Sequence, residues 1–443
     1  MGIKLLLYSA FFTFGLSGFA QEQDSLKIGY EAGTENDSVE SFTLSLEEAK
    51  IMALDYNYDL KNASLAIQEA EAAKRETVAA ALPQINASAD FTTFFGASNT
   101  MDGLGEIEFN NTSNFNASAS MFFSGTYLVA VQLSKLAISL AEKTQEQTDL
   151  SVKQQVVDAY YAILLAERTK EILDQNIDNL IKVYGQTEMM YKAGVAELTD
   201  VDQISIQVTM LESSLRTTNR QIASAYDMLK LQIGINPSST LQLTETLDDF
   251  FAPESFYIAL LRAFNIDENI DYQLMEQQVG ISEKQIKLAK MEYAPTLSAS
   301  YNHLEQIIAP NFNMSPKNTM TFSLNIPIFS SGQRKAKVDQ AKLRHETTKN
   351  SQDQLSDALV IQDRTIKRNL QTALDQYDAQ DKNVEVAKRV YENINRKYEA
   401  GMESSLNLTT ANTNYLNAES SYIQAMMDVL QAYIELEKFY NNL

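Results

Sequence analysis

The stretch YKAGVAELTDVDQ, residues 191–203, decides the fold of this chain, because a related stretch, YEAGMESSLNLTT, follows 207 positions later at residues 398–410. In both copies a Tyr-x-Ala-Gly sequence interrupts a long helical pattern. The glycine of each break can adopt the left-handed conformation that ends a helix, and polar residues after it can cap the next helix. We therefore expect two helical hairpins whose tips are these breaks, with Thr199 or Asp200 as the first cap and Ser404 and Ser405 as the second.

The breaks belong to two copies of one larger unit. The sequence FFSG ends at Gly125 and FSSG ends at Gly332, and each of these glycines lies 69 positions before the glycine of its break. Register kept over such a length indicates an internal duplication. Each unit is expected to contain a helix, two short strands, a very long helix and a return helix. The first helix of each unit is expected at about 46–82 and 255–294.

These landmarks predict five segments along the 443 residues. They are a signal peptide at 1–20, an acidic and poorly ordered N-terminal segment at 21–43, a first repeat at 44–234, a linker at 235–254 and a second repeat at 255–443. The signal peptide is indicated by Lys4, by the apolar run that follows it, and by small residues before a cleavage site after Ala20.

Composition limits the class of protein. The chain has no cysteine, so it carries neither a disulfide framework nor a lipid on an N-terminal cysteine. After the signal peptide we find no run of eighteen apolar residues, the length typical of a membrane-spanning helix. The formal net charge of -22 argues against nucleic acid as a partner. It is typical of a well-solvated exported protein and is also compatible with cationic ligands.

Four segments alternate strictly between apolar and polar residues, which predicts strands with one apolar and one polar face. In the first, Ile85, Ala87, Ala89 and Phe91 alternate with polar residues. Each strand has about ten residues, the length that crosses a bilayer when tilted, and the polar side is rich in Ser, Thr and Asn. This pattern predicts an outer-membrane β-barrel with a wet lumen lined by Asn86, Ser88, Asp90, Asn116, Ser298, Ser300, Thr321 and Asn325.

Four strands are too few to close a barrel, and an open edge in lipid leaves backbone groups unsatisfied. The chain is therefore expected to assemble. Two copies would give eight strands with a lumen filled by side chains, and three would give twelve strands with room for a channel. The alternation of residues does not choose between them.

The helices of the second unit are far longer than a compact domain needs. Neither Pro nor Gly lies between Gly332 and Tyr398, so a single helix of about 90–100 Å can form there. Its apolar positions, among them Ile366, Leu370 and Tyr377, recur with a spacing of about 3.5 residues, which is typical of a coiled-coil seam. Tyrosines in such a seam are expected to be packing groups.

The hairpin tips are the candidate functional sites. In a symmetric assembly each acidic residue at a tip would form a ring that lowers the potential for cations and could gate an entrance. Acidic residues at a helix start can also simply complement the helix dipole, and both interpretations remain open. The candidate entrance residues are Tyr191, Gly194, Glu197, Asp200 and Asp202 at the first tip, and Tyr398, Gly401, Glu403 and Asn407 at the second.

Taken together, these residues resemble the TolC-like outer-membrane efflux proteins. The resemblance runs from LSLEEAKIMALDYN at Leu44 to the C-terminus, and its most specific parts are the paired Tyr-x-x-Gly tips and IPIFSSGQRKA from Ile326, which is similar to the family's Pro-x-Phe-x-Gly-Gly strand exit. It implies an α+β membrane protein that trimerises. Twelve strands would form an outer-membrane barrel in contact with lipid, and a coiled-coil helical barrel would extend into the periplasm.

The resemblance also implies an exit channel whose tips meet a periplasmic adaptor and an inner-membrane pump. Because the sequence shows no nucleophile constellation, phosphate loop or metal cluster, we expect a passive duct with no enzymatic activity, metal or cofactor. Asp200 matches an entrance aspartate of the family, and Tyr398 matches a gate tyrosine. Asn407 stands where a second aspartate is usual, and Glu403 stands where well-known members carry an arginine. The usual lock on the closed entrance is therefore not expected in this chain.

Two other functions compete with a channel. A non-transporting structural or adhesive trimer with a coiled-coil stalk would need long loops between strands, whereas these loops span only about 96–112 and 305–318. An enzyme would need a catalytic constellation, and the only two histidines, His303 and His345, belong to different elements. The sequence gives no indication of the cargo, which could be a drug, a metal ion or a protein.

Overall fold

The computed structural model describes residues 41–95, 98–101, 105–108, 111–309 and 315–443. The signal peptide expected at 1–20 and most of the acidic segment expected at 21–43 lie outside these residues. Residues 41–43 are described, and they belong to a strand.

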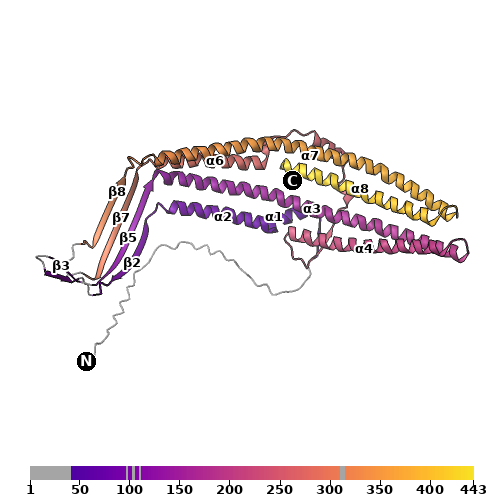
Figure 1. The fold of residues 1–443 in the computed structure, drawn as a ribbon, viewed down its shortest axis with the longest axis horizontal. Helices are drawn as coiled ribbons and strands as arrows, with labels where there is room; N and C mark the ends of the chain where they lie inside the picture. Colours follow the sequence, from indigo (N-terminus) through magenta and orange to yellow (C-terminus); the bar gives the residue numbers. More distant parts are fainter. Residues whose placement is uncertain (1–40, 96–97, 102–104, 109–110, 310–314) are drawn as a thin grey trace, which may run out of the picture. The chain divides into compact units, whose positions relative to one another are not determined.

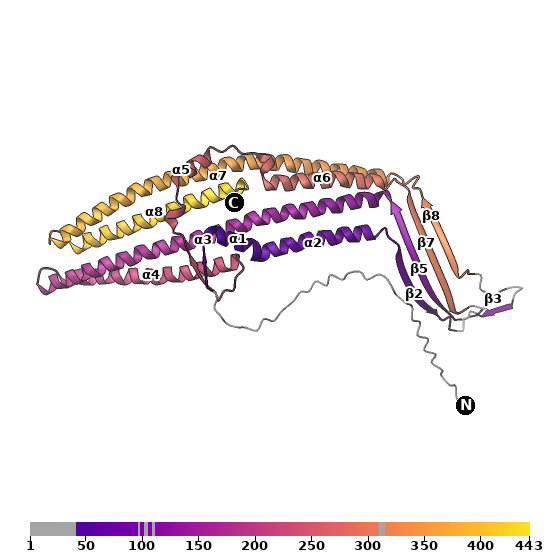
Figure 2. The ribbon, with the colours of Figure 1, turned by 180° about the vertical axis from the view of Figure 1, so that it is seen from behind.

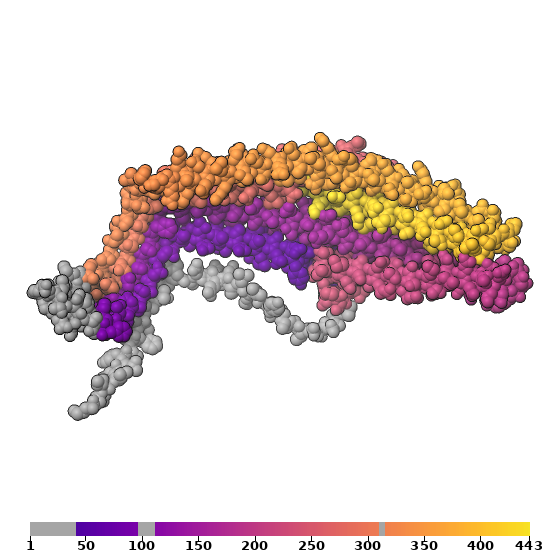
Figure 3. Space-filling model, in the orientation of Figure 1, coloured from indigo at the N-terminus to yellow at the C-terminus, as the bar shows by residue number. Residues whose placement is uncertain are grey.

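Two helical hairpins make up most of the described chain (Figure 1). The first consists of α3, Gly125–Lys192, and α4, Leu198–Gln232. The second consists of α7, Gln333–Glu399, and α8, Ser405–Phe439. α3 has 68 residues and α7 has 67, and both are uninterrupted, so each is about 100 Å long. Figure 3 shows the second hairpin lying along the first over the half of the helices that ends at the tips. The predicted hairpins are confirmed.

Two shorter helices accompany the long ones in the half that faces the sheet. α2, Tyr58–Ala79, packs against α3, and α6, Ile270–Met291, packs against both α3 and α7. The wall is therefore four helices wide in both halves, with α2 and α6 on the sheet side and α4 and α8 on the tip side (Figure 2). Among the described residues, no helix combines the length and the apolar composition that a membrane-spanning helix requires.

The predicted strands form one antiparallel sheet at the end opposite the tips (Figure 2). Its strands are β2, Gln84–Thr92; β5, Thr112–Ser124; β7, Thr296–Ile308; and β8, Asn318–Asn325. Their order is β2-β5-β7-β8. β8 ends at Asn325, although the alternation of apolar and polar residues continues in the sequence to Ile328. Pro327 interrupts this continuation, because proline has no N–H to donate to a ladder.

The remaining elements are short and lie in the connections. A hairpin of β3, Ser98–Met101, and β4, Gly105–Glu108, occupies part of the first loop between strands and was not predicted. The linker contains β6, Thr240–Leu243, which pairs in parallel with β1, Ser41–Leu44. The other short elements are α1, Leu46–Tyr56; η1, Leu247–Phe250; α5, Pro253–Leu260; and η2, Ile266–Glu268.

Each of the two helices expected at 46–82 and 255–294 is interrupted, which corrects the sequence-based expectation. Asn57 ends α1 and caps α2: its Oδ1 accepts from the Asp59 N–H at 2.7 Å, and its Nδ2 donates to the Gln232 carbonyl at 2.7 Å. Asn269 has the same two roles at the start of α6, where it accepts from Asp271 and donates to the Phe439 carbonyl at 3.1 Å. Each asparagine is thus a joint between the end of a return helix and the start of the shorter helix of the same repeat.

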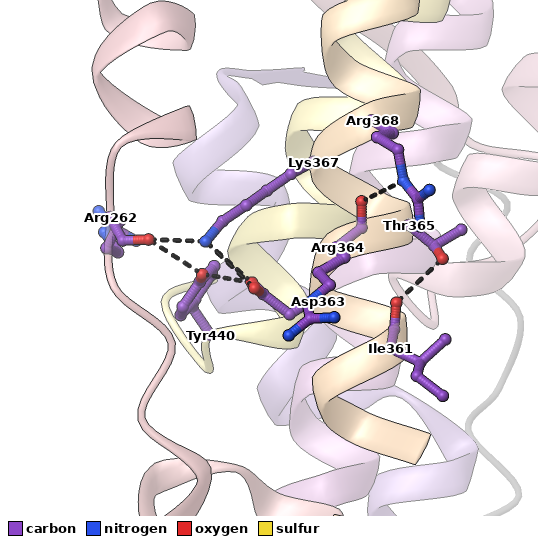
Figure 4. A network of polar contacts seen from close by, with 8 residues as sticks. All are labelled: Arg262, Ile361, Asp363, Arg364, Thr365, Lys367, Arg368 and Tyr440. Atoms are coloured by element: carbon purple, nitrogen blue, oxygen red, sulfur yellow. Dashed lines mark hydrogen bonds and ion pairs between the residues drawn. The ribbon is translucent and has the colours of Figure 1, made fainter. Parts of the chain in front are cut away.

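The main hydrophobic core surrounds these two joints. Tyr160 of α3, Phe256 of α5 and Leu430 of α8 are fully buried in it. A polar contact fastens the connecting segment to the second hairpin (Figure 4): Lys367 of α7 donates to the Arg262 carbonyl at 2.8 Å. Within that hairpin, the hydroxyl of Tyr440 at the end of α8 donates to Asp363 of α7 at 2.7 Å. The core therefore fixes the middle of the helical wall.

Candidate functional site

The first tip ends α3 with a Schellman motif, in which Gly194 has φ +75. The Gly194 N–H donates to the Tyr191 carbonyl at 2.9 Å, and the Val195 N–H donates to the Met190 carbonyl at 2.9 Å. These two bonds satisfy carbonyl groups that the end of the helix would leave unpaired. The conformation requires a left-handed residue, which explains the glycine.

The second tip repeats this geometry. Gly401 has φ +70, its N–H donates to the Tyr398 carbonyl at 2.8 Å, and the Met402 N–H donates to the Lys397 carbonyl at 2.9 Å. The tyrosine of each Tyr-x-Ala-Gly sequence therefore holds the same backbone position. Equal sequence spacing has produced equal helix ends.

The two return helices start differently. At the first tip the N-cap is Glu197, and its N–H donates to Asp200 Oδ2 at 3.0 Å, so Asp200 lies inside the first turn. Neither Thr199 nor Asp200 is the cap residue, which corrects that expectation. At the second tip Ser404 is the cap, as expected, and its Oγ accepts from the Asn407 N–H at 3.2 Å, whereas Ser405 is the first residue of α8 and not a cap.

Glu403 and Asn407 of the second tip contact each other. The Asn407 side chain donates to Glu403 Oε1 at 2.6 Å. This bond, and next the Ser404 backbone N–H, hold the pKa of the Glu403 carboxyl below its ordinary value. Glu403 is therefore a carboxylate at neutral pH, and its negative charge accepts hydrogen bonds from residues of the same tip.

Three hydrogen bonds join the two hairpins near their tips. Ser405 Oγ donates to Asp200 Oδ1. The hydroxyls of Thr187 and Tyr398 are 2.6 Å apart, and Gln207 Nε2 donates to Thr413 at 2.7 Å. Thr187 already donates to the Val183 carbonyl, so the Tyr398 O–H is the donor to Thr187. These bonds run between hairpins that are far apart in the chain.

The tyrosines at matching positions differ in exposure. Tyr398 is 4% exposed, whereas Tyr191 is 42% exposed. Burial raises the pKa of the Tyr398 phenol, and the nearby Asp200 carboxylate raises it further, so the hydroxyl keeps its proton at neutral pH. Tyr398 can therefore act as a donor throughout the neutral range.

A second hydrophobic cluster lies beside these bonds and draws on all four helices. Its buried members are Leu180 and Val183 of α3, Ile204 of α4, Tyr398 of α7 and Leu408 of α8. The sequence-based site omitted Ser405 as a partner of Asp200 and omitted Thr187 altogether. No sequence signal identifies these contacts, because they depend on how one hairpin lies against the other.

The sheet has two chemically distinct faces that continue across all four strands. Pairings on one face join Ile85 to Ala119, Ala119 to Tyr301 and Tyr301 to Met320. The register places all eight residues expected in a lumen on the opposite face: Asn86, Ser88, Asp90, Asn116, Ser298, Ser300, Thr321 and Asn325. On that face Asn114 donates to Asp90 at 2.9 Å.

Comparisons with known proteins agree with this architecture. The sequence is 25% identical over 378 residues to the pyoverdine export outer membrane protein OpmQ of Pseudomonas aeruginosa, which covers 82% of this chain and 78% of OpmQ. It is 21% identical over 379 residues to the cation efflux system protein CusC of Escherichia coli, covering 81% of this chain and 78% of CusC.

The fold is similar to solved structures of channels. A crystal structure of CusC matches with a TM-score of 0.73 at 18% identity, covering 92% of this chain and 95% of the other. The Campylobacter jejuni CmeC outer membrane channel matches with a TM-score of 0.72 at 17% identity, covering 90% and 85%. The predicted α+β architecture is thereby confirmed. The model of the outer membrane efflux protein family matches residues 51–234 and 266–442, more than half of the chain, and the protein therefore belongs to this family.

Proposed function

We propose that this protein is the outer-membrane exit channel of a tripartite efflux or secretion system. In this role it is a passive homotrimeric duct that receives substrate from an inner-membrane pump and a periplasmic adaptor and passes it across the outer membrane. The helical hairpins lie in the periplasm, and the sheet lies in the outer membrane. Export and efflux in the names of OpmQ and CusC support a transport role.

The two-faced sheet is the observation that carries this proposal. Large apolar side chains on one face are open to the surroundings: Phe322 is 69% exposed, Met320 is 66% exposed and Ile85 is 80% exposed. A contiguous apolar surface of this kind is a liability in water and is stabilised by contact with lipid. The opposite face is rich in Ser, Thr and Asn, which suits a water-filled lumen.

Closure of the barrel requires further copies, because the two outer strands leave backbone groups without a strand partner among the described residues. Three copies give twelve strands and a lumen that holds water, whereas two give a lumen that side chains fill. A passive duct therefore favours the trimer. Passage through water needs no chemical step, so we assign no catalytic residue, metal or cofactor.

The hairpin tips form the periplasmic entrance in this proposal. The bonds from Ser405 to Asp200 and from Tyr398 to Thr187 hold the two hairpins of one copy together, which keeps the entrance narrow. These bonds take the place of the interactions that close the entrance when an arginine and an aspartate stand at positions 403 and 407, which Glu403 and Asn407 cannot make. The exposed acidic residues Glu197 and Asp202 remain available to attract cations or to meet the adaptor.

Dye release from proteoliposomes tests the proposal. Full-length protein is reconstituted at a known number of copies per liposome, and the release of a small fluorophore trapped inside the liposomes is followed. We expect slow release from the wild type and release at least several-fold faster from Ser405→Ala with Tyr398→Phe, which loosens the entrance. Equal release from both proteins and from empty liposomes would contradict a duct. It would favour the non-transporting adhesive trimer, which needs no lumen.

A further inference from the structure

The side chain of Asn412 in α8 is buried without hydrogen bonds. It is 0% exposed, and neither its Nδ2 nor its Oδ1 has a hydrogen-bond partner in the described part of the chain. Buried side-chain amides usually have such partners, so this exception calls for an explanation. We propose, on the basis of the function proposed above, that Asn412 is a gating residue. Its unpaired amide destabilises the closed entrance and is hydrated when the two hairpins separate.

Two other buried polar residues share the face of α8 on which Asn412 lies. Ser405, Thr409 and Asn412 are four and three positions apart, a spacing that places them on one side of a helix. Ser405 is 2% exposed, and its hydroxyl donates to Asp200 of the first hairpin. Thr409 is 4% exposed, and its hydroxyl donates to the Leu406 carbonyl at 3.0 Å. Of these three side chains, only that of Asn412 is left without a bond.

The first hairpin covers this face of α8. The positions 207 residues earlier, in α4, are Leu198, Asp202 and Ser205, and all three are exposed. Each return helix packs against the long helix of its own hairpin, α4 on α3 and α8 on α7, so this packing does not bury the face in question. α8 also contacts α3 and α4 of the first hairpin, and this contact accounts for the burial of Asn412. Separation of the hairpins therefore gives water access to the amide.

The unpaired amide acts against the bonds that close the entrance. A buried amide without partners is less favourable than the same amide in water, by a factor of about five to one hundred in an equilibrium constant. The bonds that Ser405 and Tyr398 make to the first hairpin favour the closed arrangement. Because Asn412 opposes them, the closed and open arrangements lie closer in free energy. This balance suits an entrance that must open to pass substrate.

Replacement of the amide tests the proposal. Asn412→Leu removes the amide and keeps a branched side chain, and Asn412→Ala removes it without adding volume. Either change should raise the midpoint of thermal unfolding. Added to the loosened variant, Ser405→Ala with Tyr398→Phe, either change should slow dye release from proteoliposomes at least about five-fold. Asn414→Leu and Asn414→Ala, at an exposed position of the same helix, are the controls for helix propensity and should leave release unchanged.

Thiol labelling reports the exposure of this position directly, because the chain has no cysteine of its own. Asn412→Cys is introduced into the full-length protein and into the loosened variant, and each reacts with a water-soluble maleimide. Loss of the two bonds between hairpins favours separation, so labelling should be at least about five-fold faster in the loosened variant. Asn414→Cys should react at the same rate in both proteins, because it is exposed in the closed arrangement.

Three outcomes would overturn the role of Asn412. Lower midpoints in both Asn412 variants than in their controls, with faster release, would mean that a bound water already satisfies the amide. Higher midpoints with unchanged release would mean that Asn412 affects folding alone. Equal labelling of Asn412→Cys in both proteins would mean that loosening does not expose the position. Absence of dye release from every protein would instead defeat the proposed function, and the midpoints and labelling would still decide whether the amide opposes closure.

Discussion

Single hydrogen bonds at the tips differ between the repeats even though the backbone does not. Tyr398 donates to Thr187 from a buried position, whereas Tyr191 at the matching place is exposed. The residue 207 positions after Thr187 is Ile394, which has no hydroxyl. The duplication has therefore kept the shape of both tips, while only the tyrosine of the second tip donates a hydrogen bond to the other hairpin.

Removal of the Tyr398 hydroxyl tests this bond. We expect Tyr398→Phe to lower the free energy of unfolding by about 1 kcal/mol, because Thr187 loses a buried partner. Tyr191→Phe is the matched control at the exposed position and should change the free energy of unfolding by less than about 0.5 kcal/mol. Chemical denaturation in detergent measures both. A similar loss of unfolding free energy in the two variants would show that the bond from Tyr398 to Thr187 does not stabilise the protein beyond the removal of any tyrosine hydroxyl.

The left-handed glycines give a second prediction. Gly194→Ala places a Cβ on a residue with φ +75 and should destabilise the protein by about 1 kcal/mol. Gly185→Ala, in the interior of α3 where a Cβ meets nothing within 4 Å, should stabilise it by about 0.5–1 kcal/mol. The same denaturation assay compares them. Equal signs for the two changes would refute the assignment of the helix end.

The partly buried carboxyl of Asp158 in α3 should make the stability of the protein depend on pH. Burial raises the pKa of its carboxyl, and Lys438 opposes this only in part. Since the pKa in the folded state lies above that of the unfolded chain, stability falls as pH rises through the interval between the two values. Asp158→Asn should therefore stabilise the protein at pH 7 by roughly 0.5 kcal/mol, with allowance for solvent screening.

This advantage should vanish below about pH 3.5, where the carboxyl is protonated in both states. Asp178→Asn, the same change at an exposed position of the same helix, is the control for the loss of a carboxylate. Thermal unfolding across the pH range measures the difference. A constant difference between Asp158→Asn and the wild type at every pH would disprove the role of the buried carboxyl.

At the scale of elements, periodic patterns predicted the long helices and the strands but not their interruptions. The 3.5-residue spacing identified α7, because its seam residues Ile366, Leu370 and Tyr398 are buried against neighbouring helices. The break at Asn57 was missed, because α1 and α2 both carry helical sequences and only tertiary contact with Gln232 makes the asparagine a joint. Likewise β1 was missed, since four residues gain strand character only by pairing with β6.

The two joints can be tested as equivalent parts. Asn57→Ala and Asn269→Ala each remove a helix cap and a bond to the carbonyl that ends a return helix, so each should cost about 1–2 kcal/mol. Asn57→Asp keeps the cap acceptor but removes the donor, and its cost should be intermediate. Thermal unfolding measures all three variants. A full loss with Asn57→Asp would show that the cap contributes nothing.

At the scale of the whole molecule, the long helices separate two sites with different tasks. α3 leaves the sheet at Gly125 and reaches the first tip at Lys192, and α7 makes the same passage in the second repeat. The sheet and the hairpin tips therefore lie at opposite ends of the same helices, as the proposed membrane part and the proposed entrance would. The bonds between the hairpins lie near the tips, so we expect their removal to leave the sheet unchanged.

Single-channel conductance in planar bilayers tests the central claim most directly. The wild-type protein should insert and show a small, cation-favouring conductance, because its tips are held together. Ser405→Ala with Tyr398→Phe should raise the conductance several-fold, while Tyr191→Phe should leave it unchanged. Insertion of the assembled protein without any conductance, in the wild type and in the loosened variant alike, would contradict a passive duct.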